Sequence, residues 1–437
     1  MNIDFTRLRQ AFKKVRIVLS TFGTLGDVNP LIALALELKR RGHRPALAVP
    51  EMFRARIEPL GIGFFSVRPD QDQSDKRLVA MIYDKKKGTE YGLREFLFPA
   101  LRESYEDLLT AVEADGGADL LMTGELAYAG PIVAAKTGIP WASYVLAPFS
   151  FFSAYDPPVL PPYPTLARAQ IVVPKIGHVV TRFARYVTRR WPEPVYELRH
   201  ELGLDRGEDP IFDAKHSEQL VLALFSRVMG EPQPDWPPNT KTTGFVFYDG
   251  DAGKADLPAA LEKFLDAGPP PLVFTLGSAA VLDAGDFYER SLEAAKALNL
   301  RAVLLVGNDP ENIPKGTIPG NICIAKYAPY SRLFPRASVI IHQGGIGTTA
   351  QALRAGRPML VMPYSHDQPD NARRVRRLGV AKVVQRKNYT AERAAKMIQG
   401  LLSNPRYAER AFTVRQTLEA EDGLKTACDA LEAAIRR

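Results

Sequence analysis

The stretch VRIVLSTFGTLGDVNPLIALALELKRRGHRPALAVP, residues 15–50, holds three secondary-structure patterns in a row. Residues 15–20 form a short apolar run of the kind found in buried strands, and residues 31–43 place apolar side chains at helical spacing until Gly42 ends the pattern. The run RPALAVP at 44–50 is typical of a second buried strand. Strand, helix and strand make a β-α-β unit, so this stretch predicts a parallel sheet covered by helices.

The same order of elements recurs along the chain. It repeats in ADLLMTG, PIVAAKTG and IPWASYVLAP between 118 and 148, and a second series starts at PPLVFTLGS, residues 270–278. That series continues through RAVLLVG, NICIAKYAP, ASVIIHQ and PMLVMPYS. A proline-dense segment from 231 to 258 separates the two series and is typical of an interdomain connection. The sequence therefore predicts an α/β protein of two doubly wound domains whose loops face one another across a cleft.

The domain boundaries follow from these patterns. The first domain is assigned to 1–235, the linker to 236–257 and the second domain to 258–415. A C-terminal helix at 416–437 has no strand after it, so packing back onto the first domain is the arrangement considered for it.

Composition narrows the class of protein. With 437 residues, of which 46% are hydrophobic, the chain can build a core in each domain. The N-terminus has no apolar signal-peptide core, and no run reaches the ~20 apolar residues of a spanning helix, so we expect a cytoplasmic protein. Cys323 and Cys428 lie far apart and predict neither a disulfide framework nor a metal site. The net charge of +8 fits an anionic ligand or membrane surface, whereas no nucleic-acid recognition module is present.

A glycine-rich turn between a strand and a helix is the main candidate binding site. The sequence HQGGIGTT runs from His342 to Thr349 and leaves bare backbone at a helix N-terminus. Unpaired N–H groups there, with the hydroxyls of Thr348 and Thr349, favour an anion and suit a diphosphate. Either His342 or Gln343 would add a side-chain donor. A tight turn without a ligand is the alternative for an isolated glycine cluster.

Two further turns of small or polar residues end strands of the second domain. Thr275, Gly277 and Ser278 follow one strand, and YSHDQPDN at 364–371 follows another. Because the carboxyl ends of parallel strands meet at one edge of a sheet, these turns are expected to join the glycine turn in one site.

The spacing Gly345-x-Gly347-x-x-Ala350 also satisfies a dinucleotide fingerprint, which supports a rival function, an NAD(P)-dependent oxidoreductase. Asp367 lies twenty residues past Gly347, at about the distance of the acidic residue that binds the ribose. That acidic residue is expected to close the next strand, however, and Asp367 comes four residues beyond Pro363, in a polar cluster suited to sugar hydroxyls. The oxidoreductase is therefore the alternative function.

The glycine turn and its flanks resemble the donor-binding signature of family 1 glycosyltransferases, in the branch that holds bacterial antibiotic and lipid glycosyltransferases and sterol glucosyltransferases. GDVNPLIALALELKRRGH resembles the N-terminal signature of this branch, and QPDWPPNTKTTGFVFYDG, LVFTLGS, KYAPYSRLFPRA and HDQPDN look like the rhamnosyltransferases of rhamnolipid synthesis. The resemblance covers nearly the whole chain. It implies the GT-B fold, in which two Rossmann-like domains bind the acceptor on the first and a nucleotide sugar on the second.

On this resemblance, the turns described above supply the donor site. The residues matched to the nucleotide and diphosphate are Ser278, Tyr327, Ala328, His342, Gln343, Gly344, Gly345, Gly347, Thr348 and Thr349. The residues matched to the sugar are His366, Asp367 and Gln368. Tyr327 stands where relatives commonly stack a tryptophan on the base, with a core aromatic as the alternative. Counting back from Pro358 places Gln343 at the histidine of plant and animal relatives, so either Gln343 or His342 contacts the diphosphate.

Gln351 stands where those relatives use a glutamate to accept hydrogen bonds from the ribose hydroxyls. A weaker acceptor there favours a dTDP-sugar such as dTDP-rhamnose, which lacks the 2'-hydroxyl, over UDP-glucose. Asp249-Gly250-Asp251 matches the D-x-D metal motif of a different glycosyltransferase fold, but its place in the connecting segment favours a solvated turn. We therefore expect no metal and no cofactor, the nucleotide sugar being a co-substrate.

Asp27, in the turn TFGTLGDVNP, is the candidate catalytic residue. From the residues alone, a helix cap is the preferred explanation for a carboxylate at this position. Bacterial members of the branch commonly have aspartate where other relatives place a histidine base, so the resemblance implies that Asp27 takes the acceptor proton in an inverting displacement. The aspartate that orients the histidine in those relatives corresponds to Gly124 here, with Glu125 next to it as an unsupported substitute.

The acceptor is expected on the segment FSFFSAYDPPVLPPYP, residues 149–164. Its candidate acceptor residues are Phe149, Phe151, Phe152 and Tyr155. They suggest an apolar pocket for a small hydrophobic acceptor, with core packing as an equal alternative. Acceptor classes left open are a lipid hydroxyacid, a terpenoid or sterol, and a flavonoid or other phenolic natural product.

A helix near 179–191 carries Arg182, Arg185 and Arg189 on one face. A solvated face is favoured over weak association with an anionic membrane surface at the inner side of the membrane. The sequence leaves the oligomeric state open.

Overall fold

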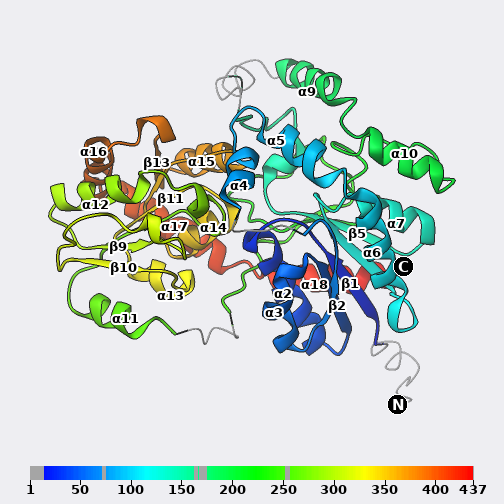
Figure 1. Ribbon diagram of the computed structural model, residues 1–437, viewed down its shortest axis with the longest axis horizontal. Coiled ribbons are helices and arrows are strands. Elements are labelled where there is room, and N and C mark those ends of the chain that lie inside the picture. Colours follow the sequence, from blue (N-terminus) through cyan, green and yellow to red (C-terminus); the bar gives the residue numbers. More distant parts are fainter. Residues whose placement is uncertain (1–13, 71–74, 162–165, 167–174, 251–255, 437) are drawn as a thin grey trace, which may run out of the picture.

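The computed structural model describes residues 14–70, 75–161, 166, 175–250 and 256–436, and contains two parallel sheets (Figure 1). The first sheet has the order β3-β2-β1-β4-β5-β6-β7 and the second the order β10-β9-β8-β11-β12-β13. The strands of the first sheet are β1 Arg16–Ser20, β2 Arg44–Val49, β3 Gly63–Ser66, β4 Leu120–Gly124, β5 Trp141–Val145, β6 Val221–Ala223 and β7 Thr240–Thr242. Those of the second are β8 Leu272–Thr275, β9 Ala302–Leu305, β10 Ile322–Ala325, β11 Val339–His342, β12 Met359–Val361 and β13 Ala381–Val383.

Helices surround both sheets (Figure 1). Those before residue 250 are α2 Leu25–Arg40, α3 Arg54–Ile57, α4 Lys76–Ile82, α5 Gly88–Tyr91, α6 Leu101–Glu113, α7 Ala129–Thr137, α9 Lys175–Thr188 and α10 Glu193–Glu201. Those after it are α11 Ala259–Asp266, α12 Phe287–Ala297, α13 Tyr330–Leu333, α14 Ile346–Arg354, α15 Gln368–Arg377, α16 Ala391–Leu402, α17 Arg406–Glu419 and α18 Gly423–Ile435. The short helical turns are η1 Glu51–Phe53, η2 Glu58–Leu60, η3 Gly92–Leu97, η4 Ala114–Gly116, η5 Pro148–Phe151, η7 Ala280–Asp283, η8 Pro310–Asn312, η9 Phe334–Arg336 and η10 Arg386–Asn388.

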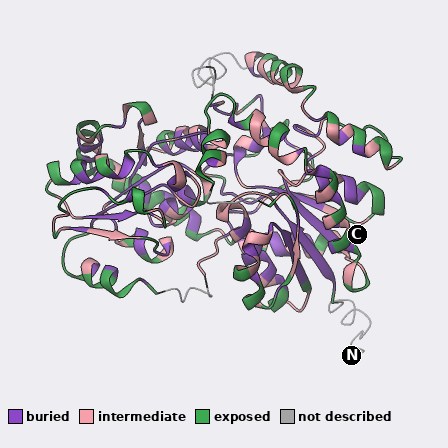
Figure 2. Cartoon of the chain, viewed as in Figure 1, coloured by how far each residue is buried: buried purple, intermediate pink, exposed green. Residues whose placement is uncertain are grey.

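Both sheets are doubly wound. In each, the chain moves outward from a first strand in one direction and then restarts beside that strand in the other, so β1 and β4 border one reversal point and β8 and β11 border the other. Strands such as β1 and β8 are buried along their whole length because helices cover both faces of the sheet, which Figure 2 shows as buried strands between more exposed helices. The predicted α/β fold with two Rossmann-like domains is confirmed.

The first sheet extends into the range assigned to the linker, 236–257. Strand β7 pairs with β6 from Val221 opposite Thr240 to Ala223 opposite Thr242, so the linker assignment begins too early. The prolines around this strand favoured an unstructured connection. A strand of three residues at the sheet edge is too short to give an alternating pattern that the sequence would reveal.

The C-terminal helices connect the two domains again. Helix α17 packs on α14, and α18 returns to α2, where Arg41 donates a hydrogen bond of 2.6 Å to Asp429. Cys428 is buried in the core of the first domain. The chain passes between the domains twice, once after β7 and once between α17 and α18. These two passages touch, because a Cβ on Gly423 would lie 2.7 Å from the carbonyl carbon of Gly244.

Elsewhere the domains meet around a buried ion cluster. Arg374 on α15 is 1% exposed; its Nε donates to Asp370 at 2.6 Å, and its Nη1 donates to the Met229 carbonyl at 2.8 Å and to Asp156 of the first domain. Asp370 also accepts the backbone N–H of Val159 at 3.0 Å. Helix α15 is therefore fixed to the first domain by charged groups removed from water.

Among the described residues, no helix combines the length and the apolar character needed to cross a bilayer.

Candidate functional site

The reversal points of the two sheets face each other. The loop after β1 leads into α2, and the loop after β11 leads into α14. A Cβ on Gly347 would lie 3.8 Å from the Cα of Gly26, so the N-termini of α2 and α14 approach closely. Ligands of doubly wound sheets bind beyond the carboxyl ends of the strands at these points. Two helix N-termini pointing toward one crevice favour a negatively charged ligand.

Asp27 lies in the first turn of α2, and it is part of a helix cap. Thr24 is the N-cap residue, its Oγ1 accepts the N–H of Gly26 at 3.1 Å, and Asp27 Oδ2 accepts the N–H of Thr24 at 2.7 Å. The capping role considered for Asp27 is therefore present. Oδ1 receives no hydrogen bond from another described residue, which leaves one carboxylate oxygen available to a ligand.

The shape of the loop makes room for this carboxylate. Gly23 has φ of 138°, and a Cβ at that position would lie 2.6 Å from the Asp27 Cγ. At Gly124, a Cβ would lie 2.8 Å from the Tyr144 hydroxyl and 2.9 Å from Thr21 Oγ1. The position matched to an orienting aspartate in relatives has no space for a side chain, so Asp27 has no such partner.

Three carboxylates share the crevice. Burial raises the pKa of Asp27 to about 6, the hydrogen bonds from Thr24 act in the opposite direction, and the charge of Glu125 raises it further. Burial also raises the pKa of Asp367 to about 7; Asn371 opposes this shift, and the charges of Asp27 and Glu125 add to it. Asp27 and Asp367, from different domains, therefore lie within electrostatic reach of one another.

Glu125 differs from Asp27 because both of its oxygens are engaged. Oε1 accepts a hydrogen bond from Ser150 Oγ at 2.6 Å, and Oε2 is paired with Lys215 Nζ at 3.1 Å. Lys215 is buried, with 7% of its side chain exposed. The lysine was not singled out in the sequence, where it carries no motif.

His342 and Gln343 have different surroundings. His342 is fully buried, its Nδ1 accepts the N–H of Gly344 at 3.1 Å, and burial lowers its pKa to about 3, so the ring is neutral. The Gln343 amide lies against both glycine turns: a Cβ on Gly345 would lie 3.0 Å from Nε2, and one on Gly277 would overlap it. Gln343 thus occupies the crevice at the reversal point, and His342 lies behind it.

Several buried polar atoms of this region have no hydrogen-bond partner among the described residues: Gln343 Oε1, Thr349 Oγ1, His342 Nε2 and Asn371 Oδ1. Buried polar groups are nearly always paired in proteins, so a cluster of unpaired ones indicates a place for ligand or water. Thr348 is also nearly buried, at 7% exposed. Ser278 lies half-buried in the turn directly after Gly277.

Tyr327 is 63% exposed, so the core-aromatic alternative for it is wrong. The neighbouring Tyr330 is half-buried against the core; its ring stacks on that of Phe334 at a centroid distance of 4.3 Å, and its hydroxyl forms a hydrogen bond of 2.8 Å with Thr275 Oγ1. Ala328 is fully buried in the core of the second domain, so the nucleotide contact predicted for this residue would have to come from its backbone.

The polar cluster after β12 is tied to the glycine turn by Asn371. Its amide donates to the Gly344 carbonyl at 3.0 Å and to Asp367 Oδ2 at 2.6 Å. Gln368 Oε1 accepts the N–H of Tyr364 at 2.9 Å, which leaves its amide nitrogen as the group available to a ligand. The sequence placed Asn371 in the cluster without giving it a role.

His366 and Tyr83 join the domains beside this cluster. His366 has a left-handed backbone with φ of 54°, and its ring lies 5.3 Å from that of Tyr83, which follows α4 of the first domain. Burial lowers the pKa of His366 to about 4, so the ring is neutral near pH 7. Burial and the charges of Asp367 and Asp27 raise the pKa of Tyr83, which places this tyrosine at the crevice. The sequence carries no sign of this role, because Tyr83 belongs to no motif.

The predicted acceptor aromatics separate into two groups. Phe151 stacks on Trp236 at 4.2 Å and is 9% exposed in a core cluster, so its assignment to an acceptor pocket is wrong. Phe149 and Phe152 pack together at 5.2 Å and are half-buried, and Tyr155 is 54% exposed. Core packing explains Phe151, while the other rings remain accessible.

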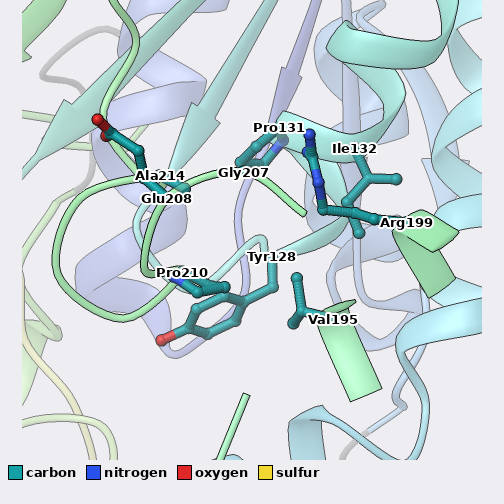
Figure 3. A pocket seen from close by; sticks show the side chains of 9 residues that line it. All are labelled: Tyr128, Pro131, Ile132, Val195, Arg199, Gly207, Glu208, Pro210 and Ala214. Carbon is teal, nitrogen blue, oxygen red and sulfur yellow. The ribbon is translucent and has the colours of Figure 1, made fainter. Parts of the chain in front are cut away.

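Two pockets open in the first domain, and Tyr128 lines both. Figure 3 shows the one between α7 and α10, with Val195 and Pro210 on its walls. The other lies at the carboxyl ends of β1 and β4, where Thr21 and Phe22 precede the Asp27 loop and apolar side chains such as Leu101 complete the wall. The second pocket therefore adjoins the crevice.

Asp249 is not a solvated turn residue. It pairs with Arg354 at 2.7 Å and accepts a hydrogen bond from the Gln351 amide at 3.0 Å. Asp251 lies outside the described residues. Within the described ranges, no group of three or more His, Cys, Asp or Glu residues is placed to hold a metal ion.

Two protein families match parts of the chain: the glycosyltransferase family 28 N-terminal domain at residues 17–115, and the erythromycin biosynthesis protein CIII-like C-terminal domain at residues 291–430. The chain is 30% identical over 429 residues to O-mycaminosyltylonolide 6-deoxyallosyltransferase of Streptomyces fradiae, covering 96% of this chain and 97% of that protein. The solved structure of the kitacinnamycin glycotransferase matches with a TM-score of 0.74 at 21% identity, over 97% of this chain and 100% of that one. The spinosyn rhamnosyltransferase complexed with thymidine diphosphate matches with a TM-score of 0.67 at 17% identity, over 95% and 100%.

These matches give no support to an NAD(P)-dependent oxidoreductase. The spacing Gly345-x-Gly347-x-x-Ala350 follows β11, the fourth strand of the doubly wound order, whereas a dinucleotide fingerprint follows the first. The two structural matches are both below 25% identity and show the fold. Matched along almost its whole length by a glycosyltransferase and folded as two facing Rossmann-like domains, the chain belongs to the family 1 glycosyltransferases with the GT-B fold and is of the antibiotic and natural-product type.

Proposed function

We propose that this protein is an inverting glycosyltransferase that moves a sugar from a nucleotide diphosphate to a hydroxyl of a small hydrophobic acceptor. The observation that carries the proposal is the opposition of Asp27 and the α14 turn across the Gly26–Gly347 contact. A donor whose diphosphate lies on that turn places its sugar near Asp367, because Asn371 ties Asp367 to the Gly344 carbonyl of the turn. Asp27 lies on the other side of the sugar, within electrostatic reach of Asp367.

The donor is held by the second domain. The first N–H groups of α14, the Gln343 Nε2 amide and the Thr348 hydroxyl bind the diphosphate, because these are hydrogen-bond donors that lie at the two glycine turns. Gln343 is proposed as the diphosphate contact in place of His342, whose ring is fully buried and accepts a backbone N–H. Asp367 and the amide nitrogen of Gln368 bind sugar hydroxyls, and the exposed ring of Tyr327 stacks on the base.

The chemical step is a displacement at the anomeric carbon. The acceptor oxygen forms the new bond while the bond to the diphosphate breaks, and the acceptor proton passes to Asp27 Oδ1, the oxygen free of the cap. The positive ends of α14 and α2 stabilise the charge that develops on the departing diphosphate. The accessible rings of Phe149, Phe152 and Tyr155 are the proposed contacts for the apolar body of the acceptor, since the pocket beneath Thr21 and Phe22 has a volume of only about 30 Å³.

A dTDP-sugar, such as dTDP-rhamnose, is the proposed donor. Gln351 stands where an acceptor for the ribose hydroxyls is expected. Its amide nitrogen donates to Asp249 at 3.0 Å, so only its neutral amide oxygen is left to accept a hydrogen bond from the ribose. A UDP-sugar gains least from such a site because its additional 2'-hydroxyl requires a good acceptor. The solved relative that contains thymidine diphosphate agrees with this choice.

Donor binding tests this proposal directly. We expect dTDP and dTDP-rhamnose to raise the melting temperature more than UDP or UDP-glucose, by mass action on the folded state. An excess of EDTA should leave both binding and transfer unchanged. Stabilisation by reduced nicotinamide dinucleotide, with none by dTDP or UDP, would contradict the proposal.

The rate of transfer should rise with pH through the acidic range. Asp27 accepts a proton only as a carboxylate, and burial raises its pKa to about 6, so protonation removes the base below that pH. Burial raises the pKa of Asp367 to about 7, so Asp367 also becomes protonated as the pH falls, and its protonation weakens sugar binding. We expect kcat/KM to increase between about pH 5 and pH 8 and then to level off, as measured in buffers of constant ionic strength.

The Glu125→Gln variant provides the control for this pH profile. The charge of Glu125 raises the pKa of both Asp27 and Asp367, so its removal should shift the acidic limb that these two carboxylates produce to lower pH. A limb that stays in place in this variant would show that another group titrates.

A further inference from the structure

Helix α9 presents apolar side chains to solvent. Val179, Phe183, Tyr186 and Val187 are 66%, 62%, 60% and 50% exposed. Their spacings of four, three and one residues place them along one side of a helix with about 3.6 residues per turn. The helix lies at the outer edge of the first domain (Figure 1). An exposed contiguous apolar stripe of this kind marks a contact site.

The opposite face of α9 already anchors the helix. Gly177 packs so closely that a Cβ would lie 3.1 Å from the Ala154 Cα. Arg185 pairs with Asp213, with Nη2 at 2.7 Å from Oδ1, and its guanidinium lies 4.8 Å from the Phe212 ring centroid. The apolar stripe is therefore not the face by which the helix folds onto the domain.

Positive charge borders the stripe. Arg182, Arg189 and Arg190 are exposed, and none of them has a carboxylate partner among the described residues. The Arg189 guanidinium lies 4.0 Å from the Tyr186 ring centroid, so charge and apolar surface are in direct contact. The net charge of the chain, +8, has the same sign.

We propose that Val179, Arg182, Phe183, Tyr186, Val187, Arg189 and Arg190, together called the α9 surface, bind the anionic face of a phospholipid bilayer. The apolar side chains enter the boundary between headgroups and acyl chains, and the arginines pair with phosphate oxygens. A second copy of this chain is a poorer partner, because it would bring the same positive charge onto itself.

The α9 surface adjoins the acceptor segment. The exposed ring of Tyr155 lies 5.7 Å from that of His178 on α9, in an edge-to-face arrangement. If the proposed function holds, a hydrophobic acceptor dissolved in the bilayer would reach the first domain beside this segment. The bilayer binding itself rests only on α9 and is tested without any substrate.

Sedimentation of the full-length protein with vesicles tests the proposal. We expect binding to vesicles of phosphatidylcholine mixed with phosphatidylglycerol, little binding to phosphatidylcholine alone, and release by salt. Each arginine near an anionic bilayer strengthens binding about fivefold, so replacing Arg182 and Arg189 together by glutamine should weaken binding roughly 25-fold. Replacing Val179 and Phe183 together by serine should weaken it by about tenfold or more.

Matched controls exist on the second domain. Arg393 on α16 is exposed, and Phe412 on α17 is 54% exposed. Arg393→Gln and Phe412→Ser should bind vesicles as the unchanged protein does, and all variants should keep its melting temperature. Equal binding to both vesicle types, no binding, or binding that the α9 substitutions leave unchanged would overturn the proposal. A dimer in solution that the Val179 and Phe183 substitutions dissociate would assign the surface to a second copy instead.

Discussion

Replacing Asp27 by asparagine is expected to lower kcat for transfer to an aliphatic alcohol by roughly 10²–10⁴-fold, the contribution typical of a general base. Asparagine keeps an oxygen that accepts the Thr24 N–H, so the cap of α2 persists while the proton acceptor is lost. Steady-state kinetics should therefore show a fall in kcat with donor binding retained. Phenolic acceptors, being stronger acids, should lose less.

Two further variants separate catalysis from structure. Glu125→Gln should retain most activity near pH 8, because both Glu125 oxygens are engaged by Ser150 and Lys215. Gly23→Ala should reduce kcat although it leaves Asp27 unchanged, since a Cβ would lie 2.6 Å from the Asp27 Cγ and move the carboxylate. Full transfer activity in Asp27→Asn would sink the assignment, and loss of activity in Glu125→Gln alone would move the role to Glu125.

Replacing Arg374 by methionine should lower the free energy of unfolding by about 3–5 kcal/mol. The substitution removes the buried guanidinium that contacts both Asp370, which is fully buried, and Asp156, and it breaks the hydrogen bond to the Met229 carbonyl. Arg373 stays 3.2 Å from Asp370 and 3.5 Å from Asp156, so two carboxylates then depend on one part-buried cation, and the cost is that of breaking a buried ion pair. Urea denaturation followed by circular dichroism measures the change.

Arg377 provides the matched control on the same helix. Its side chain is 54% exposed and lies 3.5 Å from Asp156, so solvent screens the pair. Arg377→Met should change the free energy of unfolding by less than about 1 kcal/mol. Equal midpoints for the two variants would mean that the buried cluster contributes nothing beyond a surface ion pair.

Elements with a strong periodic pattern could be predicted from the sequence, and elements decided by tertiary contacts could not. The fully buried run of β1 and the amphipathic run of α2 were recognisable because burial on both faces, or on one, imposes the pattern. Strand β7 has only three residues at a sheet edge, with none buried, so its pairing leaves no such trace.

The site follows the same division. The glycine turn and Asp367 were recognisable because glycines at a helix N-terminus and polar residues after a strand are typical of sites that bind oxyanions and hydroxyls. Tyr83 reaches the crevice from the other domain, and Lys215 comes from a distant loop to pair with Glu125, so neither has a local signal. Phe151 and Phe152 are neighbours in sequence, yet one is in the core and the other is half-buried, because η5 turns them in different directions.

The contact between Gly244 and Gly423 has a mechanical consequence. Both passages of the chain from one domain to the other run through this one place, so they form a single hinge point between the domains. A rotation of one domain about this place would stretch neither passage, and it would move the loop that carries Asp27 away from the turn that carries Asp367. Such a rotation has to break contacts that join the domains elsewhere. These include the ion cluster around Arg374, the Tyr83–His366 contact and the ion pairs of Lys76 with Asp309 and Glu311. Together these contacts resist opening of the crevice.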